Sequence, residues 1–150
     1  MRAINHAMTG ALIGLTVSSP VIALPLAVAS HFVLDSIPHY ADDERVPINS
    51  KIFAIELAVD ALLCGLLVLA LMARTPDNWF VPSLAALAAA SPDFMSIARY
   101  LRGIRRGDTS KDSKYTIRQF HTRIQNESPK AWPVEVIWAL GCIVLLARAT

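Results

Sequence analysis

Charged residues are scarce in this chain of 150 amino acids: they make up 17% of it, whereas hydrophobic residues make up 54%. Ordinary soluble proteins carry about 25% charged residues, and the mean hydropathy of +0.44 is high for a chain of this size. The shortage of charge argues against an ordinary soluble domain. An integral membrane protein is therefore the first hypothesis.

Cysteine is also scarce, and a cleavable signal sequence is not apparent. Cys64 and Cys142 lie far apart in apolar runs, so they are more simply core or lipid-facing residues than a disulfide or a zinc pair. The amino-terminal segment has one basic residue, Arg2, and its apolar run continues beyond the length of a signal peptide. Internal repeats and low-complexity tracts are lacking too. We expect a retained first helix and one domain, 1–150.

Apolar runs predict an all-α fold, a polytopic membrane bundle of about five helices. The expected helices cover about residues 3–18, 21–37, 51–73, 79–101 and 132–148, the fourth interrupted by SPD. A span needs about 20 apolar residues, and the third helix is the clearest candidate. The first two helices are short, so this hairpin either crosses the membrane or is re-entrant.

Basic residues gather between positions 99 and 130, where there are nine of them against three acidic residues. Loops rich in lysine and arginine stay in the cytoplasm. With five spans, the amino terminus and the basic loop at about 102–130 are then cytoplasmic. The expected location is a bacterial-type inner membrane, crossed several times.

This topology brings ionisable side chains of all five helices to the cytoplasmic boundary. They are His6, His31, Asp35, Glu56, Asp60, Asp93 and Glu135. Each such group within a bilayer costs roughly 2.5–3.5 kcal/mol on insertion scales. A divalent metal would offset this cost, so the sequence predicts a metal site.

Two pairs of residues have a spacing that suits such a site. His31 and Asp35 are four residues apart, which puts them on one face of a helix, and the helix ends soon enough for His39 to fold back toward them. Glu56 and Asp60 repeat this spacing with two carboxylates. Imidazole and carboxylate together suit zinc, and carboxylates also suit manganese or iron.

Each of these polar residues also has a structural interpretation, as hydrogen-bonding groups that tie helices together in lipid. Glu56 and Asp60 could face water or pair with a basic residue. Asp93 could be a turn residue, and His39 a solvated one. Glu135 lies in a first helical turn, where the helix dipole favours an acid.

The basic loop has a feature of its own, because aromatic and aliphatic residues alternate with basic ones between positions 115 and 124. This pattern is typical of an interfacial helix or a lid, and a solvated loop near anionic headgroups is the alternative. Arg118, His121 and Arg123 are candidates for holding a phosphate, which suits the fork of arginine. Nucleic-acid binding is disfavoured because the patch is short and no nucleic-acid module is recognisable.

Four motifs together carry a resemblance to a known family. They are NHAMTGALIG at 5–14, HFVLDSIPH at 31–39, SPDF at 91–94 and FHTRIQ at 120–125. The chain resembles the bacterial inner-membrane metal-dependent hydrolases, small multi-helix proteins distantly similar in motif to zinc-dependent phospholipase C. The resemblance implies metal ligands at His6, His31, Asp35 and Asp93, and substrate residues at His121 and Arg123. Here SPDF lacks the second acid of the family's PDxD element, and FHTR lacks the paired histidine.

The expected function is a membrane-embedded hydrolase that depends on zinc, manganese or iron. Its substrate would be a phosphoester or ester of a lipid or lipid-linked molecule at the cytoplasmic membrane boundary. Asp60 or Glu56 would be a further ligand or the base for the attacking water, with His39 beside them.

A non-catalytic membrane scaffold stays open as an alternative. A small ion or proton transporter is disfavoured because segments 65–72 and 141–147 contain no acids. The sequence does not determine the oligomeric state.

Overall fold

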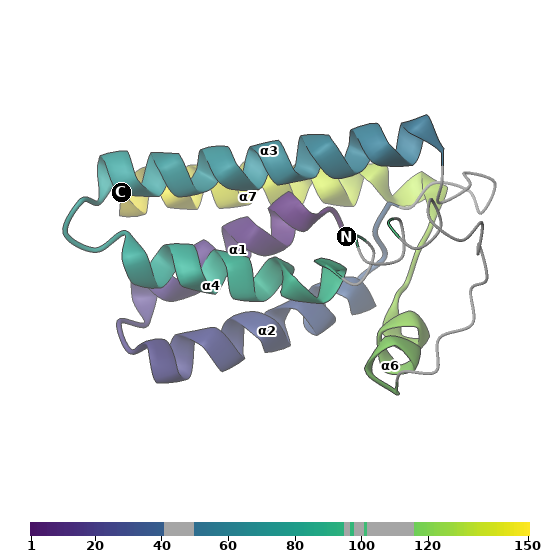
Figure 1. The fold of residues 1–150 in the computed structure, drawn as a ribbon, viewed down its shortest axis with the longest axis horizontal. Helices are drawn as coiled ribbons and strands as arrows, with labels where there is room; N and C mark the ends of the chain where they lie inside the picture. Colours follow the sequence, from purple (N-terminus) through teal and green to yellow (C-terminus); the bar gives the residue numbers. More distant parts are fainter. Residues whose placement is uncertain (41–49, 95–96, 98–100, 102–115) are drawn as a thin grey trace.

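The chain folds into a bundle of α-helices (Figure 1). The computed structural model describes residues 1–150 except 41–49, 95–96, 98–100 and 102–115. The helices are α1 (Ala3–Thr16), α2 (Pro20–Ser36), α3 (Lys51–Arg74), α4 (Phe80–Ala90), α6 (Thr116–Ile124) and α7 (Trp132–Ala149), with short 3-10 helices η1 (Ser91–Asp93) and η2 (Pro129–Ala131). Within the described ranges the only extended pairing is an isolated bridge between His39 and Glu127. The predicted all-α class is confirmed.

Local sequence signals explain where most of these helices begin and end. Pro20 occupies the first turn of α2, where its missing N–H costs nothing. The same helix ends at Ser36, because Pro38 forces the residue before it, Ile37, into an extended conformation. The Ser50 side chain caps α3 by accepting a hydrogen bond from the Phe53 backbone N–H at 3.1 Å.

The fourth helix is interrupted at SPD, as the sequence predicted. Helix α4 runs as far as Ala90 and the 3-10 helix η1 follows, and among the described residues after it Phe94, Ile97 and Leu101 are again helical. Pro92 explains the interruption, since a proline removes a hydrogen-bond donor and its ring clashes with the preceding turn of an α-helix. The tighter turn carries Asp93 at its end.

Helix α1 is the central element of the bundle. It packs against α2 and α4 on one side and against α3 and α7 on the other (Figure 1). Its approach to α4 is close enough to require glycine: a Cβ added at Gly10 would overlap the carbonyl oxygen of Ala85, and one added at Gly14 would overlap Pro82. Two glycines four residues apart are a common packing motif of membrane helices.

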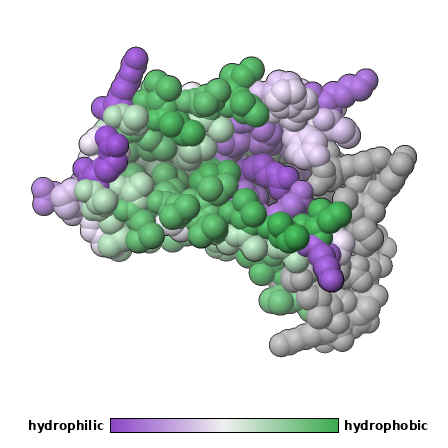
Figure 2. Space-filling view, turned by 90° about the horizontal axis from the view of Figure 1, so that it is seen from above, coloured by the Kyte–Doolittle hydropathy of each residue, from purple (hydrophilic) through white to green (hydrophobic). Residues whose placement is uncertain are grey.

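Helices α3 and α7 present apolar side chains to the outside. By length and composition, Lys51–Arg74 and Pro129–Ala149 could each cross a membrane. A core helix of a soluble protein would pass the same test but would be mostly buried, whereas Leu71 is the only buried residue of α3. Figure 2 looks onto this side, where hydrophobic side chains predominate among the described residues. This surface supports membrane association.

Helices α1 and α2 are shorter than a typical membrane span. Helix α1 has 14 residues and α2 has 17, both below the roughly 20 that a span needs. The described residues therefore contain two candidate spans where the sequence predicted five. The five-span topology and its orientation stay predictions. About half of the predicted basic loop, 102–115, lies outside the described residues, and α6 occupies part of the rest.

Replacing Gly10 with alanine is expected to destabilise the bundle, because the added methyl group must separate α1 from the α4 backbone. Overpacking of this kind costs about 1–3 kcal/mol. Gly65→Ala is the matched control, because a Cβ at Gly65 meets nothing within 4 Å. The free energy of unfolding in detergent micelles would be measured for both variants. An equal effect of the two substitutions would contradict the close α1–α4 contact.

Candidate metal centre

All four histidines of the chain meet around one carboxylate, that of Asp35. Oδ2 of Asp35 lies 2.6 Å from Nε2 of His121 and 3.1 Å from Nε2 of His31. Oδ1 lies 3.1 Å from Nε2 of His6 and 3.9 Å from Nε2 of His39. All five residues are buried, so this cluster forms part of the protein interior.

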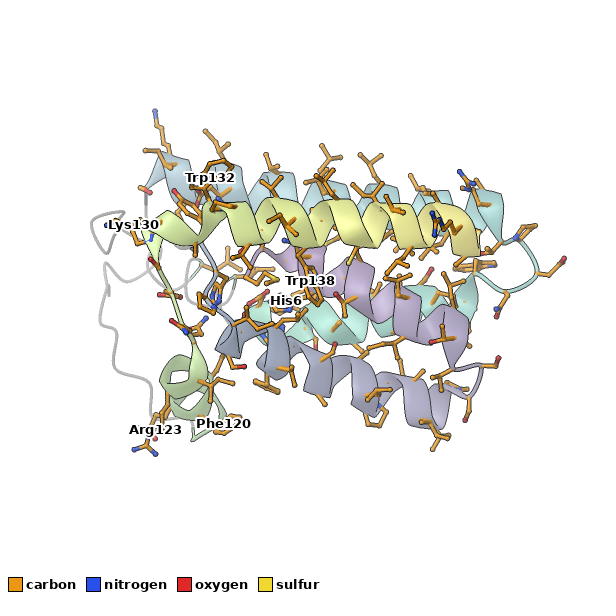
Figure 3. The ribbon with its side chains drawn as sticks, turned by 180° about the vertical axis from the view of Figure 1, so that it is seen from behind. His6, Phe120, Arg123, Lys130, Trp132 and Trp138 are labelled. Carbon is orange, nitrogen blue, oxygen red and sulfur yellow. The ribbon has the colours of Figure 1, made fainter. Side chains whose placement is uncertain are left out.

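Three parts of the chain deliver these residues. His6 lies near the start of α1, and the last turns of α2 carry His31 and Asp35 on one face. Figure 3 shows His6 pointing into the bundle between these helices. Backbone hydrogen bonds then hold the segment after α6 against the end of α2: the Asn126 N–H donates to Asp35 O at 2.9 Å, and the Ser128 N–H to His39 O at 2.9 Å. This pairing brings α6, with its histidine, to the cluster.

Two of the histidines have their orientation set by backbone carbonyls. Nδ1 of His31 lies 2.8 Å from Ala89 O, and Nδ1 of His39 lies 2.8 Å from Ile37 O. A carbonyl oxygen only accepts, so Nδ1 is the protonated nitrogen that donates in each ring. Nε2 then faces the cluster, carrying a lone pair in the neutral ring. Metal-binding histidines are oriented in the same way by a hydrogen bond from their other nitrogen.

The inward-facing atoms of His31, His121 and Asp35 lie close to one another. Nε2 of His31 lies 3.1 Å from both Nε2 of His121 and Oδ2 of Asp35. A neutral His31 would direct its lone pair at a carboxylate oxygen, which is unfavourable unless a positive charge lies between them. Ligand atoms about 2.0–2.1 Å from a tetrahedral zinc lie about 3.4 Å from one another. The two 3.1 Å separations are somewhat below this value, and the third, 2.6 Å between Nε2 of His121 and Oδ2 of Asp35, is the distance of a direct hydrogen bond.

Two overlapping groups of side chains could hold a metal ion. One is His31, Asp35 and His121, and the other is His6, His31 and Asp93; within each group the ligand atoms lie within 4.8 Å of one another. Oδ1 of Asp93 lies 3.9 Å from Nε2 of His31. Its other oxygen is buried and has no hydrogen-bond partner among the described residues, and the same is true of Nδ1 of His6. A bound cation would satisfy such atoms, so the residues present fit a metal.

Asp93 lies in η1, outside the two candidate spans. Burial raises the pKa of this carboxyl to about 6, against the partial opposition of nearby His31. An uncompensated carboxylate is costly in the interior, and a metal ion is one way to keep it ionised. A bound cation would lower the pKa of Asp93 and satisfy its unpaired oxygen.

The other predicted acids lie in a second polar group, at the amino-terminal end of α1. Arg2 forms ion pairs with Glu56 at 3.0 Å and with Asp60 at 4.0 Å. Glu135 accepts hydrogen bonds from the Arg2 backbone N–H and from the Asn5 side chain. This group, here called the α1 anchor, joins α1 to α3 and α7, and acids at a helix amino terminus are favoured by its dipole. The catalytic role of Glu56 and Asp60 stays a prediction.

The predicted substrate residues fall into different places. His121 was assigned to a phosphate, but the structure places its ring among the possible metal ligands. Arg123 is exposed on α6, and the side chain of Arg118 lies outside the described part of the structure. His39, a catalytic candidate, borders the cluster. One contact was not expected from the sequence: the amino group of Met1 forms a 2.7 Å ion pair with the Asp35 carboxylate at the centre of the cluster.

No family model, curated protein or solved structure matches this chain. The class of protein is therefore defined by the fold and the cluster alone. It is an all-helical bundle with two candidate membrane spans and a buried histidine–aspartate group that could hold a metal.

Replacing Glu135 with alanine is expected to lower the free energy of unfolding by about 1–3 kcal/mol, because two donors would lose their acceptor in a buried site. The control is Glu127→Ala, which removes an exposed acid. Chemical denaturation in detergent, followed by helical circular dichroism, gives both values. A Glu135→Ala variant as stable as the control would show that the α1 anchor does not hold the helices together.

Proposed function

We propose that this protein is a membrane-embedded, metal-dependent hydrolase of a lipid or lipid-linked phosphoester or ester. The observation that carries the proposal is the convergence of four buried histidines with two aspartates, Asp35 buried and Asp93 partly buried. Buried ionisable groups within a membrane protein are expensive and usually mark a functional site.

Zinc is the first candidate for the metal, since imidazole and carboxylate are its usual ligands, with manganese or iron as alternatives. His31, Asp35 and His121 would hold it, and His6 and Asp93 supply further ligand atoms. When bound, such an ion lowers the pKa of a coordinated water and polarises a phosphoryl or acyl oxygen.

The protein side chains would orient the ligands and handle the proton. Ala89 O and Ile37 O fix the rings of His31 and His39 with Nε2 toward the cluster. The unpaired oxygen of Asp93 can accept a hydrogen bond from the attacking water, and Glu56 or Asp60 is the alternative base.

The surroundings of the cluster favour a lipid substrate. Phe120 and Trp132 are more than half exposed at this end of the bundle, and Arg123 and Lys130 are exposed there as well (Figure 3). Exposed aromatic and basic side chains together are typical of the level of the lipid headgroups. A phosphoester in a headgroup would lie at the depth of the cluster. In the proposed orientation this is the cytoplasmic face of a bacterial-type inner membrane.

Purified protein is expected to contain near-stoichiometric zinc, manganese or iron, measured by elemental analysis in detergent. The double variant His31→Ala, Asp35→Ala removes a ligand from each possible group and should lose the metal while keeping its helical content. Asp77→Asn, which changes an exposed acid in the turn after α3, should retain it. Absence of metal from the parent protein, even after reconstitution with these ions, would refute a metal centre.

Catalysis is tested separately, with mixed micelles of the metal-loaded protein and phospholipid. We expect phosphoester or ester hydrolysis that stops on chelation and returns with the metal. His121→Ala should lower kcat by about 10–100-fold, the effect of removing a group that supports a metal centre, while Arg123→Gln should mainly raise KM. Metal binding without hydrolysis of any phospholipid class would favour the scaffold alternative, in which protein ligands saturate the ion.

A further inference from the structure

A groove of about 500 Å³ lies between α3 and α7, with α1 as its floor. One wall runs along α3 from Leu63 to Arg74, and the other along α7 from Ala139 to Thr150. Apart from Arg74 and Thr150, every residue that lines it is apolar. Both walls belong to candidate membrane spans, and buried core side chains, those of Met8, Leu71 and Leu146, line part of the groove.

The groove is separate from the metal centre. Its floor is formed by Ile4 and Met8, four residues apart on one face of α1. His6 lies two residues from each of them, which turns its side chain about 200° around the helix axis. The cluster and the groove therefore use opposite faces of α1.

The length of the groove corresponds to one leaflet of a bilayer. Eleven residue steps separate Leu63 from Arg74, and at 1.5 Å per residue this is about 16 Å. The hydrocarbon core of a bilayer is about 30 Å thick. The walls thus extend from the middle of the membrane to one surface, the surface opposite the metal centre.

Charge at the open end indicates which lipid fits. Arg74 is exposed in the last turn of α3, at the depth where an acyl chain in the groove would join its headgroup. A guanidinium at this level attracts anionic lipids and can bind phosphate oxygens with two hydrogen bonds.

We propose that the α1–α3–α7 groove binds one acyl chain of an anionic phospholipid, whose phosphate contacts Arg74. This lipid belongs to the leaflet opposite the metal centre and is not the substrate of the proposed hydrolase. Its binding holds α3 and α7 at a constant separation over the half of the bundle that lies beyond the α1 anchor.

The test uses the full chain in detergent, with dioleoyl-phosphatidylglycerol and dioleoyl-phosphatidylcholine as probes. Native mass spectrometry should show one phosphatidylglycerol retained per chain, and the unfolding temperature should rise with this lipid more than with phosphatidylcholine. Arg74→Gln should weaken phosphatidylglycerol binding by about fivefold, the effect of one basic residue at a membrane surface. Ala70→Trp fills the groove and should abolish retention.

Two matched controls make the result specific. Arg148→Gln removes an exposed arginine near the end of α7, outside the groove, and Leu69→Trp adds the same ring to α3 on a face that does not line it. Neither should change lipid retention. If Arg148→Gln weakens binding as much as Arg74→Gln, or if the two tryptophan variants behave alike, the groove is not the site.

Ala147→Trp, from the opposite wall, replaces Ala70→Trp if that variant fails to fold. The metal content of all these variants is measured in parallel and should be unchanged.

Discussion

The carboxylate of Asp35 is the interaction on which the arrangement of the helices depends. An ionised carboxylate within an apolar bundle is strongly unfavourable unless positive charge or hydrogen-bond donors surround it. Helix α1 supplies His6, the end of α2 supplies His31, and the segment containing α6 supplies His121. Each element that reaches Asp35 is thereby held near the same point. The largest fully buried side chains are consequently mostly polar ones, while much of the apolar core is alanine.

Helix α1 connects this polar centre with the membrane-facing side of the protein. Gly10 and Gly14 let it approach α4 closely, which sets the distance between His6 and the 3-10 turn that carries Asp93. At its amino terminus the α1 anchor fixes the helix to α3 and α7 through Glu135 and the acids of α3. The same helix therefore forms one side of the proposed metal centre and the floor of the lipid groove. Its two glycines allow the close contact with α4, and the polar residues at its amino-terminal end join it to α3 and α7.

Much of the candidate site could be predicted because its residues are costly in an apolar sequence. His6, His31, Asp35 and Asp93 were expected to converge, and the structure brings them together. The acids of α3 have the same helical spacing as the histidine–aspartate pair, yet they lie beside Arg2, because spacing does not say which neighbour a helix face will meet. The interruption of the fourth helix at SPD was predicted, because Pro92 cannot continue the helical hydrogen bonds. His121 was placed with the substrate because nothing local to α6 reveals what it folds against.

Helical periodicity, proline positions and the scarcity of charge were sufficient to determine the class of fold, the limits of most helices and the i, i+4 pairing of His31 with Asp35. These properties depend on neighbouring residues and on the cost of burying polar groups, so they can be read along the chain. Tertiary structure alone decided which distant groups share one site. Asp35 is 29 residues from His6 and 86 from His121. Contacts between residues so far apart in the sequence depend on how the helices pack and on where the connecting loops lead, and no local pattern encodes them.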